Sequence, residues 1–284
     1  MELWEFIPSE LKVLDMPWKE TLIMPLGDIH YGSDGCETDL LRRTLKFGKE
    51  HNAYYIGMGD HVEVASPSNR LILQAQELYE GSEKMIEEAA DATVRRLLRV
   101  LEGTQDRWLG ILEGDHFMEF GDGTSSDSRL AAALGAPFLG TCSMIRLIFD
   151  RGGARRSVVI WLHHGWGSGM TIGAPYNKLE RCAIAWPEVD IFIAGHDHRR
   201  GALPLTALYM TRNRKPTLRD KTRWLVKSGS YLRAYLEGSK YHGRPKGGYI
   251  EKRALPPATL GSPKIWIRPF YRGKNSELDI TVES

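Results

Sequence analysis

Apolar residues gather in five short runs along the chain, and each run is closed by glycine and a polar residue. A run holds four to six apolar residues with few charges, a composition typical of strands buried inside a sheet. The runs occupy residues 22–30, 53–60, 107–116, 157–165 and 189–198. The pattern therefore predicts a sheet protein in which several strands end in residues that can do chemistry.

The segments between these runs show helical periodicity. Helices are expected over residues 38–52, 70–101 and 129–134, and in the segment that follows the glycine-rich loop at 165–173. Thr38 or Asp39 would cap the first helix, and Gly81 with Ser82 would interrupt the second. Asp122 and residues 125–128 either border a site or form a simple connection.

Other stretches predict further strands. Residues 142–150 and 155–162, joined by Arg151, Gly152 and Gly153, predict a β-hairpin. Strand-like runs also occur at 222–228, 231–236 and 264–271. The expected fold is α/β, with two mixed β-sheets packed face to face and helices outside. We expect one domain over residues 1–284, in which the C-terminal part, residues 199–274, completes the second sheet.

The residues that close the five runs share one chemical character, because all are aspartate or histidine. They are Asp28, His30, Asp60, Asp115, His116, His163, His164, His196 and His198. In open α/β sheets, sites form outside the carboxyl ends of the strands, so these side chains are expected to meet at one edge. Five strands that deliver aspartate and histidine to one edge predict a metal site.

Spacing adds to this interpretation. Asp28 and His30 are two residues apart, as are His196 and His198, so on extended backbone each pair would point the same way. Carboxylate and imidazole ligands suit zinc, iron, manganese, cobalt or nickel. The set exceeds what one ion needs, and two divalent ions about 3.5–4 Å apart, bridged by a shared carboxylate, would use all of it.

The order of these residues resembles that of the calcineurin-like metallophosphoesterase superfamily, in particular its phage and prokaryotic phosphodiesterase members. The family motifs are DxH, GD, GNH, H and GHxH. Their counterparts here are Asp28-x-His30, Gly59-Asp60, Gly114-Asp115-His116, a histidine at 163 or 164, and Gly195-His196-Asp197-His198. The resemblance covers about residues 22–231, and the motifs are highly specific as a set.

The resemblance implies a four-layer sandwich and a dinuclear metal-dependent phosphoester hydrolase. Asp60 would bridge the two ions, a metal-bridging hydroxide would be the nucleophile, and His116 would be the catalytic residue outside the coordination shell. Family members commonly read His-Gly at the fourth motif, which favours His164 as the ligand and leaves His163 as the alternative. The remaining metal ligands would be Asp28, His30, Asp115, His196 and His198.

This chain departs from the family at Asp115, where the family has asparagine. A carboxylate there should hold the second ion more tightly and make the site less electrophilic toward a phosphoester. We therefore keep open a metal-binding but weakly active scaffold role beside the predicted hydrolase.

Charge is distributed unevenly along the chain. Residues 1–198 contain 19 basic residues (Lys and Arg) and 30 acidic residues (Asp and Glu). Residues 199–274 contain 19 basic residues and only 3 acidic residues. A basic segment beside the metal site would attract a phosphodiester, a nucleotide or nucleic acid. This favours phosphodiesters over phosphomonoesters and keeps open a nuclease acting on DNA or RNA. A solvated surface that balances the acidic half is equally compatible with the charge pattern.

Composition adds only general limits. The chain has 284 residues, 42% of them hydrophobic, enough for a sizeable core. Three scattered cysteines favour a reducing, cytoplasmic location over a disulfide framework. No apolar run approaches the roughly 20 residues of a membrane span, so we expect no membrane partner. Nothing in the sequence indicates the oligomeric state.

Overall fold

The computed structural model describes residues 10–64, 80–167, 169, 171–212, 214–238, 240–247, 251, 254, 256–273 and 275–284. Its helices are α1 (Thr38–Glu50), α3 (Glu80–Val100), α4 (Ser126–Ala133) and α5 (Gly173–Ala185). Within the described residues, no helix is both long and apolar enough to cross a lipid bilayer.

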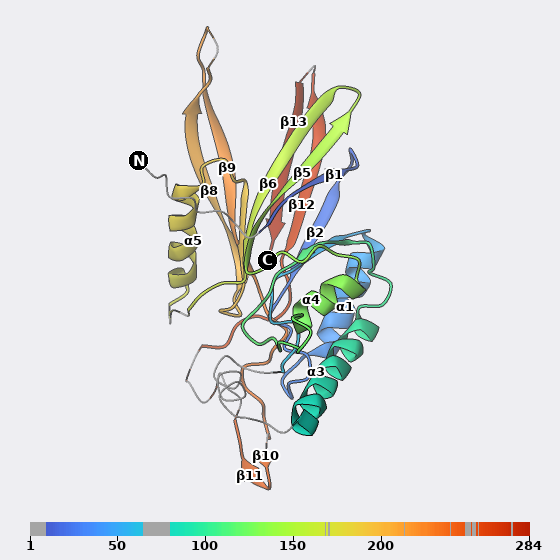
Figure 1. Ribbon diagram of the computed structural model, residues 1–284. Helices are drawn as coiled ribbons and strands as arrows, with labels where there is room; N and C mark the ends of the chain where they lie inside the picture. Colours follow the sequence, from blue (N-terminus) through green and yellow to red (C-terminus); the bar gives the residue numbers. More distant parts are fainter. Residues whose placement is uncertain are drawn as a thin grey trace, which may run out of the picture.

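The strands form two mixed sheets and one small hairpin (Figure 1). The six-stranded sheet contains, in spatial order, β1 (Glu10–Met16), β5 (Cys142–Arg151), β6 (Ala154–His163), β7 (Ile191–Ala194), β9 (Leu218–Ser228) and β8 (Arg200–Met210). The five-stranded sheet contains, in spatial order, β13 (Asn275–Glu283), β12 (Lys264–Arg272), β2 (Thr21–Leu26), β3 (Tyr54–Gly57) and β4 (Trp108–Ile111). The hairpin pairs β10 (Lys240–Tyr241) with β11 (Arg244–Pro245).

Three apolar clusters divide the molecule into four layers. Residues such as Ile56 and Ile160 fill the space between the two sheets. Leu41, Val94 and Leu130 of α1, α3 and α4 pack on the outer face of the five-stranded sheet. Leu179 of α5 packs on the outer face of the six-stranded sheet. The predicted class, two mixed sheets flanked by helices, is confirmed.

All five predicted buried runs contain strands, namely β2, β3, β4, β6 and β7. β2, β3 and β4 are parallel to one another, and β6 is parallel to β7. Carboxyl ends of parallel neighbours lie at the same edge of a sheet, so the chain segments after these strands are brought together. The β5–β6 hairpin is also present, with Arg151 paired to Ala154.

The start of α1 differs from the prediction. Neither Thr38 nor Asp39 caps this helix, because the N-cap residue is Glu37, and no side chain accepts a hydrogen bond there. The entry to α1 is instead fixed by the Glu37 backbone N–H, which donates to the Tyr231 carbonyl (2.8 Å). A tertiary contact therefore determines where α1 begins. In the predicted helix over 70–101, residues 70–79 lie outside the described residues, and Gly81 with Ser82 lies in the first turn of α3.

The C-terminal part is divided between the two sheets instead of completing one of them. β8 and β9 extend the six-stranded sheet, while β12 joins the five-stranded sheet by pairing with β2. The expected strand at 231–236 is wrong, because that segment forms only an isolated bridge between Leu232 and Cys36. Tyr231 is fully buried and donates its backbone N–H to the Asp28 carbonyl (3.0 Å), so the segment wraps around the first motif.

Candidate metal centre

The aspartates and histidines that follow β2, β3, β4, β6 and β7 lie together. Three overlapping groups each bring ligand atoms within 4.8 Å of one another. These groups are Asp28 with His30 and His198, His30 with Asp60 and His116, and Asp60 with His164 and His196. Residues up to 170 positions apart in the chain therefore converge at the strand ends.

The backbone that carries these side chains is not extended. β2, β3 and β7 end at Leu26, Gly57 and Ala194, before the candidate ligands are reached. The left-handed residues among the candidates are Asp28 (φ 48°), His30 (φ 49°), Asp60 (φ 50°), His196 (φ 71°) and His198 (φ 60°). A left-handed φ in a residue other than glycine costs about 1–3 kcal/mol and is concentrated at functional sites. The expectation of paired side chains on extended backbone is thus wrong in its local geometry. Asp28 and His30 still share one group, whereas His196 and His198 belong to different groups.

Asp60 occupies the middle of the cluster. Its Oδ1 accepts hydrogen bonds from the backbone N–H groups of Asp115 (2.6 Å) and His116 (2.9 Å). Its Oδ2 lies 3.7 Å from His30 Nε2 and 3.5 Å from His164 Nε2. One carboxylate oxygen therefore fixes the loop after β4, and the other faces histidines on two sides.

Gly114 allows the close approach of that loop to Asp60. A Cβ at position 114 would lie 2.0 Å from the Asp60 backbone nitrogen and 2.2 Å from its Oδ1. Real Cβ atoms do not approach other atoms this closely, so a larger residue would push the loop away from the carboxylate. The glycine of the third motif is explained by this contact.

Two groups of side chains flank Asp60. On one side, His198 Nε2 lies 3.5 Å from Asp28 Oδ1 and 3.3 Å from His30 Nε2. On the other side, Asp115 Oδ2 lies 3.0 Å from His196 Nδ1 and 3.9 Å from His164 Nε2. Each side holds one carboxylate and two imidazoles, with Asp60 between them.

Several of these polar atoms fit a bound cation. Among the described residues, the buried Asp28 Oδ1 and His164 Nε2 have no hydrogen-bond partner. Buried polar atoms are nearly always paired, so atoms without a protein partner at a cluster of carboxylates and imidazoles fit the coordination of a cation. Burial raises the pKa of Asp28 to about 6, which a nearby cation would reverse. The residues present could hold a divalent metal ion.

The cluster is closed on one side and open on the other. Asp28, His30, Asp60 and His164 are buried, with 3% or less of each residue exposed. By contrast, the side chains of Asp115, His196 and His116 are 44%, 29% and 28% exposed. A ligand from solvent would therefore reach the cluster over these three residues.

Glu63 is a site residue that the sequence analysis missed. Its Oε2 lies 2.6 Å from His30 Nδ1, and its Oε1 lies 2.9 Å from His116 Nδ1. Burial raises the pKa of Glu63, but the hydrogen bonds to the two histidines outweigh it and lower the pKa to about 2. The sequence did contain a signal for Glu63. It is an acid three residues after Asp60, and the third motif lacks an acid of its own because Phe117 follows His116.

A buried pair lies behind the loop after β4. Asp127 Oδ1 lies 2.9 Å from His61 Nδ1, and its Oδ2 accepts the Gly114 N–H at 3.1 Å. A capping box between Ser125 and Ser128 starts α4 and so places Asp127 there. Residues 125–128 were open to two interpretations, a border of the site or a simple connection, and Asp127 among them supports the loop after β4 from behind.

Asp197 belongs to none of the three groups and pairs instead with a lysine of β9. Its Oδ2 lies 2.8 Å from the buried Lys227 Nζ of β9, which also donates to the Gly195 carbonyl at 2.9 Å. This buried, hydrogen-bonded ion pair holds the loop that carries His196 and His198.

The two neighbouring histidines have different surroundings. His164 Nδ1 lies 2.8 Å from the Met58 carbonyl, which holds the proton on Nδ1 and turns the Nε2 lone pair toward Asp60. His163 belongs to none of the three groups, and its ring stacks on Trp161 at 5.6 Å. The structure therefore places His164 in the cluster, while its role as a ligand stays a prediction.

Replacing His164 by alanine is expected to lower metal content and to reduce turnover by about 100-fold or more, because a ligand is lost. Replacing His163 by alanine should leave both within about threefold of wild type, since its ring lies outside the cluster. Metal analysis and turnover of each variant provide the check. Activity that is lost in His163→Ala and kept in His164→Ala would reverse the assignment.

No family model and no curated protein matches this chain. Solved structures are similar in shape. A Vps29 from Entamoeba histolytica complexed with zinc has 12% identity and a TM-score of 0.36, over 92% of this chain and 99% of that one. GAP50, the anchor in the inner membrane complex of Plasmodium, has 10% identity and a TM-score of 0.45, over 92% and 84%. A predicted phosphoesterase from Streptococcus pneumoniae TIGR4 has 13% identity and a TM-score of 0.32, over 92% and 98%. With TM-scores below 0.5, these likenesses do not bear on the function of this chain.

Proposed function

We propose that this protein is a metal-dependent phosphoester hydrolase of the calcineurin-like metallophosphoesterase superfamily, with two divalent ions and a preference for phosphodiesters. The observation that carries the proposal is the position of Asp60, whose Oδ2 lies between His30 (3.7 Å) and His164 (3.5 Å). A carboxylate so placed, flanked on each side by one carboxylate and two imidazoles, suits a shared ligand of two ions.

Seven residues would hold the metal ions. Asp28, His30 and His198 would bind one ion, Asp115, His164 and His196 the other, and Asp60 both. When bound, such ions supply Lewis-acid stabilisation of the phosphoryl oxygens and an activated water at neutral pH. The mixed ligand set suits manganese, zinc, iron, nickel or cobalt.

His116 would act on the reacting phosphoester from outside the ligand set. Burial lowers its pKa, but the hydrogen bond to Glu63 and the charges of Asp60 and Asp115 raise it above the ordinary value. Glu63 thus holds a proton on Nδ1 and leaves Nε2 free to face the substrate. A protonated ring at the open rim can stabilise a phosphoryl oxygen or give a proton to the leaving group.

The charge of Asp115 supports a diester over a monoester, and nearby basic residues suit a substrate with further phosphate groups. Asp115 adds a carboxylate to the open rim, and it repels a dianionic monoester more than a monoanionic diester. Arg199 and Arg200 directly follow His198, so two positive charges lie at this end of β8. The far end of the β8–β9 hairpin lies farther from the cluster, because the 11 residues of β8 extend about 35 Å.

A nuclease is the second candidate. Part of the basic segment packs beside the loop that follows His30, where Lys246 Nζ lies 3.7 Å from Asp34 Oδ2 and the Arg233 N–H donates to the Gly35 carbonyl. A strand of nucleic acid could follow this side of the molecule toward the cluster. A cytoplasmic location, inferred from the cysteines, is part of the same proposal.

The test is turnover of bis(p-nitrophenyl) phosphate, p-nitrophenyl phosphate and single-stranded DNA, each with manganese, zinc, nickel and magnesium. We expect metal-dependent hydrolysis in which the diester is cleaved faster than the monoester. Preferential cleavage of DNA would favour the nuclease. Tight metal binding without turnover of any substrate would contradict the enzyme proposal and favour a scaffold role.

A further inference from the structure

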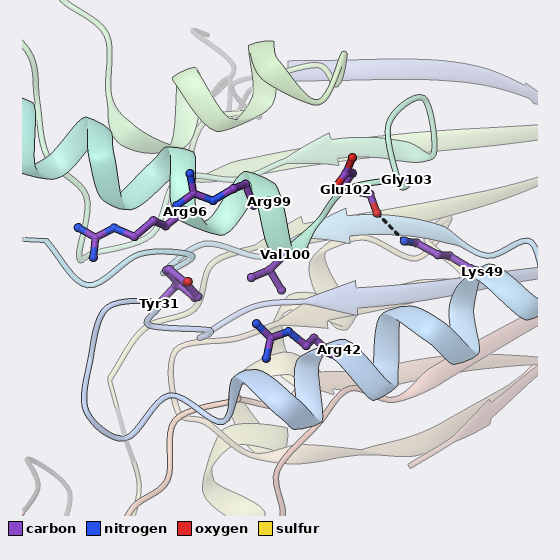
Figure 2. Close-up of a pocket in the computed structure, with 8 residues that line it drawn as sticks. All are labelled: Tyr31, Arg42, Lys49, Arg96, Arg99, Val100, Glu102 and Gly103. Atoms are coloured by element: carbon purple, nitrogen blue, oxygen red, sulfur yellow. Dashed lines mark hydrogen bonds between the residues drawn. The ribbon is translucent and has the colours of Figure 1, made fainter.

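A cavity of about 600 Å³ lies between α1 and α3, apart from the metal centre. Arg42 and Lys49 of α1 and Arg96 and Arg99 of α3 line it, and Glu102 is the acidic residue among its lining. Figure 2 shows Arg42 and Lys49 extending from α1, with Tyr31 and Val100 between the two helices. We call this space the α1–α3 cavity.

Positive charge is concentrated in this cavity, although the surrounding part of the chain has more acidic than basic residues. Residues 1–198 carry 30 acidic against 19 basic residues, yet four of those basic residues line this cavity. Arg96 and Arg99 are three positions apart on one helix, a spacing at which like charges destabilise the helix. An anion between α1 and α3 would relieve this repulsion.

The cationic groups remain available to such an anion. Within the described part of the chain, Lys49, Arg96 and Arg99 form no ion pair. Lys49 Nζ donates to the Glu102 carbonyl, and Arg96 Nε donates to the Ala92 carbonyl (3.3 Å). Arg42 pairs with Asp39 at 2.9 Å, but both side chains are more than 60% exposed. An ion pair so exposed contributes little and is readily exchanged.

We propose that the α1–α3 cavity binds an oligophosphate, an anion of about three phosphate groups. Arginine forks bind phosphate oxygens in pairs, and lysine adds a mobile point charge. The volume lies within the range of small-ligand sites, while four cationic side chains make the lining unsuited to an apolar ligand. Both an inorganic oligophosphate and a nucleoside triphosphate offer this chemistry, and only the latter would use the Tyr31 ring for stacking.

The test is isothermal titration of the full-length, metal-loaded protein with inorganic triphosphate and, separately, with ATP. The variant is Arg42→Gln/Arg96→Gln. Its control is Arg43→Gln/Arg95→Gln, which changes the adjacent position on each helix. Arg43 and Arg95 are exposed, and the control removes the same charge and, like the variant, breaks one surface ion pair. Any binding at the metal centre is common to all three proteins.

We expect Arg42→Gln/Arg96→Gln to weaken triphosphate binding about tenfold or more, because hydrogen bonds to charged groups are the strong ones. The control should stay within about twofold of wild type, and turnover of bis(p-nitrophenyl) phosphate should be unchanged in both. ATP binding tighter than triphosphate would identify a nucleotide as the ligand. Equal weakening in variant and control, or no saturable binding beyond the metal centre, would overturn the proposal.

Discussion

Replacing Asp60 by asparagine is expected to empty the metal centre and to lower turnover by about a thousandfold or more. Asparagine keeps an oxygen that can accept the N–H groups of Asp115 and His116, as Asp60 Oδ1 does at 2.6 and 2.9 Å. It replaces Oδ2, the oxygen that lies between His30 and His164, by an amide NH2 group, whose nitrogen cannot serve as a ligand. The loop should therefore be preserved while the proposed shared ligand is lost.

Metal content per chain, measured by mass spectrometry after gentle purification, and turnover of bis(p-nitrophenyl) phosphate provide the check. Asp39→Asn is a matched control, because Asp39 lies on α1 and pairs only on the surface with Arg42. A melting temperature equal to that of metal-free wild type would show that Asp60→Asn keeps its fold. Wild-type metal content and turnover in Asp60→Asn would refute the shared-ligand assignment.

Replacing His116 by glutamine should produce a different result, in which turnover falls about 100- to 10,000-fold while metal content is kept. His116 lies on the open rim, and general acid catalysis contributes an effect of this size. Replacing Glu63 by glutamine should cost about 10- to 100-fold, because Glu63 orients the rings of His116 and His30.

The leaving group separates the roles open to His116. If its ring donates a proton, the loss in His116→Gln should be larger for a phenyl diester than for a p-nitrophenyl diester, whose leaving group needs little protonation. The comparison uses kcat/KM of both substrates for wild type and variant at saturating metal. An equal loss on both substrates would instead assign His116 to stabilisation of the phosphoryl oxygens.

Much of this site was predictable because strand ends carry a strong sequence signal. The runs before Asp28, Asp60 and His196 are apolar, short and closed by glycine, and each contains a strand of the structure. Parallel pairing then brings their ends together without further information. The order of the aspartate and histidine residues along the chain then indicated a metal site.

The remainder depends on contacts that no local pattern encodes. The left-handed backbone of Asp28, with φ 48°, is held from distant parts of the chain, since Ser230 Oγ donates to its carbonyl at 2.8 Å. Glu63 does not directly follow a strand, so the strand-end pattern does not mark it. His61 contacts Asp127, which lies 66 positions later in the chain. Such residues are recognised only when the fold is known.

The placement of β12 also has a consequence for the order in which the protein matures. β12 pairs with β2, so Ile265 lies beside Ile23, and β2 leads directly into the segment that carries Asp28 and His30. During synthesis, β2 therefore lacks one neighbour until residues 265–267 have left the ribosome. Pairings between residues so far apart in sequence form slowly, and an unpaired β2 edge is exposed to aggregation in the meantime. The β2 edge is thus most exposed to aggregation before β12 docks, and the segment with Asp28 and His30 follows a strand whose pairing is completed late.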